Sequence, residues 1–169
     1  HPTKCYFKNR KLAQTKSKIM LQNILEDCKK QLFSALKHKK HPFRFFTLAT
    51  SSPEGGSHLR TVVLRDFDPE QMQFTIFTDT RSKKVADLNR AANAQFLFYD
   101  GTRLIQLVVD AEMVSSTNNT TEYQSLPEPS KKDYASKQTP GTPIDAPDHM
   151  SHDFPTGNLT KNVFQAERL

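Results

Sequence analysis

Two short segments carry basic and hydroxyl side chains at spacings suited to binding an anion. The first is Arg60-Thr-Val-Val-Leu-Arg65, an alternating segment with an arginine at each end. The second is Phe77-Thr-Asp-Thr-Arg-Ser-Lys-Lys84, in which a strand-like stretch runs into a Ser-Lys-Lys cluster. Cations and hydroxyls that converge from separate segments are the groups that a phosphorylated ligand requires. The sequence therefore predicts a site for a phosphate ester.

The cluster Ser82-Lys83-Lys84 lies where a helix is expected to begin. Unpaired backbone N–H groups and the positive end of the helix dipole favour an anion at such a position. The serine hydroxyl and two ammonium groups would add to that field, and Thr78 at the end of the preceding strand would add another hydroxyl. The alternative is an ordinary capped helix whose lysines lie in solvent.

The two arginines of the first segment are not equivalent. In a regular strand, Arg60, Val62 and Leu64 share one face, while Thr61, Val63 and Arg65 share the other. We therefore expect one arginine to hold the phosphate and the other to face a separate pocket or the rim. Two surface arginines on a half-exposed strand are the alternative.

Gln106 is a polar residue within the apolar segment Leu104–Val109. An unpaired side-chain amide in such a strand would cost about 1–3 kcal/mol, so Gln106 must find partners. A heterocycle with carbonyl and N–H edges would satisfy it. Pairing within the protein or at a subunit interface is the alternative.

The elements that position these residues follow from apolar periodicity and turn chemistry. Apolar residues recur at helical spacing from Ser17, the expected N-cap, until Pro42 ends the helix. A short helix is expected from Ser82 to about Asn93, and weaker helical signals lie at 117–126 and 130–137. Five strands at this spacing with one inserted helix indicate a small barrel. The strands are expected at 43–51, 58–67, 72–79, 94–99 and 103–114.

The chain of 169 residues suits one domain with a real core. We expect a basic N-terminal arm at 1–16, a single domain at 17–138 and an irregular C-terminal segment at 139–169. Within that last segment, Leu159–Leu169 is expected to begin a strand that the chain does not complete. No metal site is predicted, because Asp148-His-Met-Ser-His-Asp153 matches no metal-binding spacing.

The net charge of +6 is unevenly distributed. Residues 1–45 hold 12 Lys/Arg and 2 Asp/Glu, a net charge of +10, so the remainder of the chain is at −4. Such a basic segment is typical of a nucleic-acid or membrane-surface arm, or of a solvated helix face. No apolar run suits a membrane span or a signal peptide, and the two cysteines form no metal-type pair. A reduced, cytoplasmic protein is expected.

Taken together, these motifs resemble the pyridoxamine 5′-phosphate oxidase superfamily of flavin-binding split barrels. The resemblance extends from about Phe45 to Gly141, more than half of the chain. Its pieces occur in the order of the family: Leu48-Ala-Thr50, Arg60–Arg65, Phe77–Lys84, Gln106 and Ser136-Lys-Gln-Thr139.

The resemblance implies a mainly β split barrel with peripheral helices, a homodimer that binds FMN in clefts at the subunit interface. It also implies roles for individual residues. Arg60, Thr61, Val62, Val63, Leu64 and Arg65 would line the flavin, flanked by Phe77 and Thr78. Ser82, Lys83 and Lys84 would hold its phosphate, and Gln106 would meet the ring system. Gln138 and Thr139 would contribute from the other subunit.

Three departures separate the chain from the oxidase of that superfamily. Arg65 stands where the oxidase has a lysine close to the substrate phosphate, and Arg keeps the charge but not the shape. Tyr123 is followed by Pro127 at the position of a substrate-binding arginine. The Trp, Arg and Arg-x-His features of the oxidase's C-terminal region have no match before Leu169.

The sequence thus favours an FMN-dependent oxidoreductase that acts on an unassigned small molecule, rather than vitamin B6 oxidation. No catalytic residue is assigned. A non-catalytic flavin-binding module is one alternative. A nucleic-acid-binding protein that uses the basic N-terminal arm is another.

Overall fold

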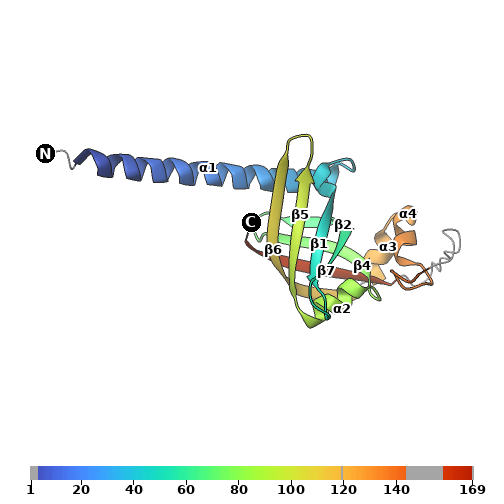
Figure 1. The fold of residues 1–169 in the computed structure, drawn as a ribbon. Helices are drawn as coiled ribbons and strands as arrows, with labels where there is room; N and C mark the ends of the chain where they lie inside the picture. Colours follow the sequence, from blue (N-terminus) through green and yellow to red (C-terminus); the bar gives the residue numbers. More distant parts are fainter. Residues whose placement is uncertain (1–3, 119, 144–157, 169) are drawn as a thin grey trace.

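Seven antiparallel strands form one curled sheet in the order β2-β1-β5-β6-β7-β4-β3 (Figure 1). The computed structural model describes residues 4–118, 120–143 and 158–168. The strands are β1 (Phe45–Ser51), β2 (Ser57–Val63), β3 (Asp66–Asp68), β4 (Gln73–Asp79), β5 (Asn93–Asp100), β6 (Ile105–Asn118) and β7 (Leu159–Arg168). The predicted mainly β architecture with peripheral helices is confirmed.

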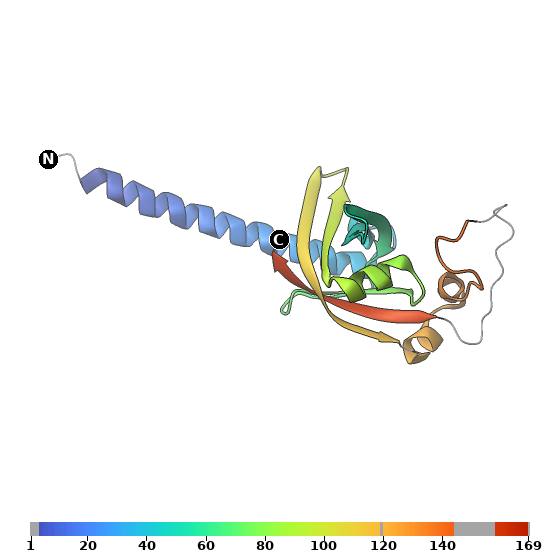
Figure 2. The same ribbon diagram turned by 60° about the horizontal axis from the view of Figure 1, so that its bottom comes forward.

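The helices lie around this sheet. They are α1 (Lys4–Lys37), α2 (Lys83–Arg90), α3 (Thr120–Ser125) and α4 (Glu128–Lys131), with 3₁₀ turns η1 (Pro42–Arg44) and η2 (Lys132–Tyr134). The N-terminal half of α1 projects away from the sheet, while α3 and α4 lie at the other end of the molecule (Figures 1 and 2). Among the described residues, no helix combines the length and apolarity needed to cross a membrane.

The predicted start of the first helix is wrong. The structure continues α1 back to Lys4, although Ser17 offered a capping side chain. No Gly or Pro interrupts residues 4–37, and Lys, Leu, Gln and Ala are all favourable in helices. A serine inside such a run therefore does not stop the helix.

Two hairpins follow the local turn signals and are confirmed. β1 pairs with β2 through a turn in which Gly55 and Gly56 have φ of +94° and +77°. Residues with side chains rarely adopt these values, so the glycines permit the turn. β5 pairs with β6 from Asn93↔Glu112 to Asp100↔Ile105.

The predicted single strand 58–67 is wrong, because the chain changes partners within it. The Leu64 backbone N–H donates to the Arg44 carbonyl, beside β1, at 2.9 Å. The next N–H, from Arg65, donates to the Thr75 carbonyl of β4, also at 2.9 Å. β2 and β3 are consecutive in the chain, yet they form the two opposite edges of the sheet. The connection Leu64-Arg65 therefore links the two edges and closes the curl.

The expectation that a strand begins at Leu159, within the C-terminal segment 139–169, is confirmed for residues 159–168, so this part of the segment is not irregular. These residues form β7, which lies between β4 and β6 and pairs with both. Its inward side chains alternate as in a regular strand, since Thr160, Asn162 and Phe164 are buried. Residues 144–157, which include the sequence Asp148–Asp153, lie outside the described residues.

The core lies inside the curl and is dominated by phenylalanine. The rings of Phe96 and Phe164 have centroids 5.1 Å apart, and those of Phe46 and Phe98 are 4.5 Å apart. Leu32 of α1 and Leu88 of α2 complete this cluster from its two sides. The inward face of the sheet is therefore filled, and chemistry must occur at its margins.

Candidate functional site

Arg60 projects from β2 toward the inner side of the sheet. It pairs in register with Leu48, whose side chain is fully buried on that side. Its Nη1 donates to Thr50 Oγ1 at 2.6 Å and to the Leu48 carbonyl at 3.5 Å. Its Nη2 donates to Asp87 Oδ2 of α2 at 3.3 Å. Arg60 thus joins β2, β1 and α2.

Lys84 lies in the first turn of α2, beside the end of β4. Its Nζ donates to Thr78 Oγ1 at 2.8 Å, and Thr78 Oγ1 lies 3.2 Å from Ser82 Oγ. Ser82 occupies the N-cap position of α2, but its hydroxyl makes no capping hydrogen bond. Thr78 Oγ1 therefore links the Lys84 ammonium to the Ser82 hydroxyl, which does not cap the start of α2.

Helix α2 brings the charges of Arg60 and Lys84 close together. Lys84 and Asp87 are three residues apart, so they lie on the same side of the helix. Asp87 contacts Arg60, and this arrangement places the guanidinium and the ammonium in one region. Burial lowers the pKa of Lys84, the nearby Arg60 charge lowers it further, and Asp79 partly opposes them. The sequence prediction that Arg60, Thr78, Ser82 and Lys84 converge is consistent with this geometry.

Asp87 is the acidic member of this cluster. Its Oδ2 accepts hydrogen bonds from Thr50 Oγ1 at 2.7 Å and lies 2.9 Å from His58 Nδ1. Burial raises the pKa of this carboxyl, but hydrogen bonds from His58 and Thr50 and the charges of His58 and Arg60 outweigh it. The pKa of Asp87 is therefore below its ordinary value. Asp87 contacts the permanent charge of Arg60, and Lys84 adds a second cation close to Arg60.

Arg65 forms a second basic position on the β4 side. Its Nη2 donates to Tyr134 Oη at 3.1 Å, and its guanidinium carbon lies 5.7 Å from the centre of the Phe77 ring. Its Nε is buried and has no hydrogen-bond partner among the described residues. Burial lowers the pKa of Arg44, and the Arg65 charge lowers it further. Arg65 thus retains an unused donor in a basic environment.

The segment that carries Gln138 and Thr139 is held beside the β4–α2 connection. Arg81 Nη2 donates to the Ser136 carbonyl at 2.6 Å, and Nη1 donates to the Lys137 carbonyl at 3.1 Å. Asp79 orients this arginine through bonds of 2.7 and 3.0 Å. Gln138 is half-buried and Thr139 is exposed. Their contribution to a second subunit stays a prediction.

The remaining predicted residues point elsewhere. Val62 and Leu64 are buried in the core. Lys83 is exposed at the start of α2, and Thr61 is exposed on β2. Gln106 is exposed on β6. Thr61 and Gln106 lie on the outer face of the sheet, whereas Arg60 lies on the inner side.

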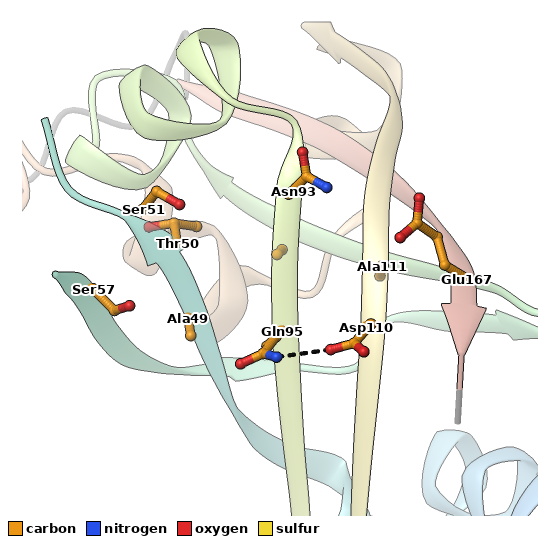
Figure 3. Close-up of a pocket in the computed structure, with 10 residues that line it drawn as sticks. Ala49, Thr50, Ser51, Ser57, Asn93, Gln95, Asp110, Ala111 and Glu167 are labelled. Atoms are coloured by element: carbon orange, nitrogen blue, oxygen red, sulfur yellow. Dashed lines mark hydrogen bonds between the residues drawn. The ribbon is translucent and has the colours of Figure 1, made fainter. Parts of the chain in front are cut away.

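The outer face also carries a polar hollow of about 300 Å³. Ala49, Gln95 and Asp110 are register neighbours across β1, β5 and β6 and line it. Figure 3 shows the Gln95 amide beside the Asp110 carboxylate, and the hydrogen bond between them is 2.7 Å long. Glu167 of β7 lies at its other margin. Thr50, which contacts Arg60 and Asp87, also lines this hollow, so the hollow adjoins that part of the site.

Sequence reasoning missed Asp87 and His58 as members of the site. Asp87 is the only acid of α2 and lies near two lysines, a pattern that usually marks a solvent-facing ion pair. The clue was the apolar spacing of Val85 and Leu88, which places Asp87 at the edge of the buried side. The motif Leu48-Ala-Thr50 includes Thr50, but the sequence indicates no role for its hydroxyl.

A curled antiparallel sheet with one short inserted helix is the architecture of the split barrels. A sequence profile described as "Pyridoxamine 5′-phosphate oxidase, FMN-binding domain" matches residues 25–114, just over half of the chain. The chain belongs to this family, as the sequence motifs indicated.

Relatives support the same assignment. A pyridoxine/pyridoxamine 5′-phosphate oxidase of Microcystis aeruginosa (strain NIES-843 / IAM M-2473) is 41% identical over 64 residues. That match covers 38% of this chain and only 29% of the relative. It therefore concerns a small part of that enzyme.

Solved structures share the fold at low identity. A pyridoxamine 5′-phosphate oxidase-related, FMN binding protein from Nostoc punctiforme PCC 73102 has a TM-score of 0.62 and 22% identity, covering 79% of this chain and 76% of that chain. PhzG from Burkholderia lata 383, in complex with tetrahydrophenazine-1-carboxylic acid, has a TM-score of 0.64 and 15% identity, covering 82% and 74%. These likenesses confirm the split barrel.

Proposed function

We propose that this protein binds FMN and acts as a flavin-dependent oxidoreductase on a small molecule. The observation that carries the proposal is the convergence of Arg60 and Lys84, from separate elements, beside the hydroxyls of Thr78 and Ser82. A phosphate monoester is dianionic near neutral pH and accepts hydrogen bonds from all of these groups. The donor set therefore fits the phosphate of FMN.

The hydrogen-bonding capacity of Arg60 agrees with this assignment. A guanidinium has five N–H donors, and the described residues accept three hydrogen bonds from Arg60. Two donors remain for a ligand. Bound FMN would supply the redox chemistry, while the chain would supply position and charge.

We further propose that the site is completed by a second copy of the chain. The outer face of the sheet exposes several large apolar side chains, of which Leu59 is the most exposed at 69%. Phe45, Leu97, Tyr99 and Val108 are also exposed on this face. A contiguous apolar face of this kind is typical of a protein interface. Gln106 lies on the same face, so it would contact a flavin held by a partner's Arg60 rather than by its own.

A non-catalytic flavin-binding module is the second candidate, and the surroundings of Tyr123 favour it. This tyrosine is only 3% exposed and packs with Tyr134 and Leu159. It is therefore part of a small core rather than of an open substrate pocket. Reduction of the bound flavin by a donor, followed by repeated turnover, would select the enzyme over the module.

Flavin binding is tested directly with the purified protein. We expect absorption in the flavin region and release of FMN on denaturation. Arg60→Ala and Lys84→Ala should each raise the dissociation constant of FMN about tenfold to a hundredfold, as expected for a lost hydrogen bond to a charged group. Lys39→Ala, which removes an exposed lysine from the turn after α1, is the charge-matched control. Full FMN affinity in both site variants would refute the assignment.

A further inference from the structure

Asp87 is a buried carboxylate that three neighbours hold in place. Its side chain is 5% exposed, although it lies on a short surface helix. Burial of an ionised carboxylate is unfavourable unless hydrogen bonds and opposite charges compensate it. Here Thr50, His58 and Arg60 all approach the same oxygen, Oδ2, at 2.7, 2.9 and 3.3 Å. Such a compensated carboxylate fixes the groups around it.

Thr50 and Asp87 restrain both terminal nitrogens of Arg60. Nη1 is held by Thr50 on β1, and Nη2 is held by Asp87 on α2. Thr50 also donates to Asp87, so the three side chains form a closed triangle. A long arginine side chain loses its rotational freedom in such a triangle. That loss is then complete before any ligand binds, which is the condition for preorganised recognition.

We infer that Asp87 is a positioning residue for Arg60: together with Thr50 it fixes the guanidinium beside Lys84, so that two donors stay available for a phosphate ester. This inference rests on the proposed function, because it gives Asp87 a part in that anion site. His58 of β2 also holds Asp87, since its Nδ1 lies 2.9 Å from Asp87 Oδ2.

The negative charge of Asp87 and its positioning role predict opposite effects on FMN binding when the carboxylate is neutralised. A negative Asp87 repels an incoming phosphate, so charge alone predicts that its neutralisation would tighten FMN binding. The positioning role predicts that neutralisation would weaken FMN binding, because Arg60 would lose its fixed orientation. The sign of the change therefore separates the two explanations.

The experiment compares Asp87→Asn with Glu112→Gln. Glu112 is exposed on β6, so its variant changes the net charge equally without contact to the cluster. We expect Asp87→Asn to raise the FMN dissociation constant about tenfold, the effect of one hydrogen bond to a charged group. Riboflavin, which lacks the phosphate, should bind both variants as it binds the wild-type protein. Tighter FMN binding by Asp87→Asn, or an equal loss for riboflavin, would overturn the inference.

A second pair of variants covers the possibility that Asp87→Asn folds poorly. Thr50→Val removes the hydroxyl that links Arg60 to Asp87, whereas Thr50→Ser keeps it. We expect weakened FMN binding for Thr50→Val and wild-type binding for Thr50→Ser. Equal FMN affinity of the two variants would show that the Thr50 hydroxyl does not help to position Arg60, and would contradict the inference.

A measurement without flavin separates failure of the Arg60 positioning from failure of the proposed function. Nuclear magnetic resonance of the Arg60 guanidinium protons should show slow rotation of the group in the wild-type protein. It should show faster rotation in Asp87→Asn and Thr50→Val. Restrained rotation without FMN binding would support the inference and refute the proposed function. Equally fast rotation in all three proteins would refute the inference.

Discussion

Phe96 and Leu97 are adjacent on β5 but point to opposite faces of the sheet, so truncating each has a different expected consequence. Phe96 is fully buried, and its ring lies 5.0 Å from Phe46, 5.1 Å from Phe164 and 5.5 Å from Phe74. Replacing a buried Phe by Ala costs about 3–5 kcal/mol in total, and the aromatic contacts of Phe96 place it in the upper part of that range. We therefore expect Phe96→Ala to lose about 4–5 kcal/mol of unfolding free energy.

Leu97 is 37% exposed and belongs to the proposed dimer face. Leu97→Ala should cost under about 1 kcal/mol in the monomer, as is usual for residues away from the core. It should instead raise the dimer dissociation constant.

Urea unfolding and sedimentation, both performed over a range of protein concentrations, measure the two effects separately. In thermal unfolding, the midpoint temperature of Phe96→Ala should fall by about 8–20 °C, from a loss of about 2–4 °C per kcal/mol in a chain of this size. A loss below about 1 kcal/mol in Phe96→Ala would refute the described core. Unchanged association in Leu97→Ala would count against the proposed dimer face.

Two further predictions follow from the perturbed ionisable groups. The pKa of Asp87 is lower in the folded protein than its ordinary value of 3.8, so its stabilising contribution is complete above that value and is lost as the pH falls through the lowered pKa. Acid unfolding of Asp87→Asn, followed by circular dichroism, should lack this contribution; an acid transition identical to that of the wild-type protein would contradict it. The pKa of Lys84 is also lowered, by burial and by Arg60, so FMN affinity should decline as the pH rises toward 10.5. Lys84→Arg should keep its affinity in a fluorescence titration over that range, and a parallel decline in both proteins would exclude Lys84 as the titrating group.

Local chemistry made the two hairpins and the short helix predictable. Gly55 and Gly56 mark a turn by their backbone freedom, and the apolar residues on both sides fix which face is buried. Likewise, Ser82 marks the start of α2. These signals act over a few residues, so a single sequence contains them.

The missed features depend on contacts between distant segments. The break after Val63 arises because the following residues bond to Arg44 and then to Thr75, and no local breaker marks it. The sequence predicts a strand from Leu159, but periodicity alone does not reveal that β7 lies between β4 and β6 and pairs with both. Long-range pairing thus overrides the weak local preference.

The same distinction between local signals and long-range contacts applies to the residues of the candidate site. Arg60, Thr78, Ser82 and Lys84 were recognisable because each belongs to a short motif with a physical meaning. For Asp87, the spacing of Val85 and Leu88 gives only its place at the edge of the buried side of α2. Its contacts with Thr50, His58 and Arg60 depend on β1 and β2 packing against α2, which the sequence does not show.

The position of β7 between β4 and β6 has a consequence for synthesis on the ribosome. The strands β2, β1, β5 and β6 can pair as they emerge, but until β7 is made β4 has only the three-residue β3 as a neighbour. Thr80, next to β4, bonds with Thr160, which is translated eighty codons later. One edge of β4 therefore stays unpaired in the nascent chain until residues 159–168 are made. An unpaired strand edge is a site of aggregation, so a pause in translation before Leu159 would favour misfolding.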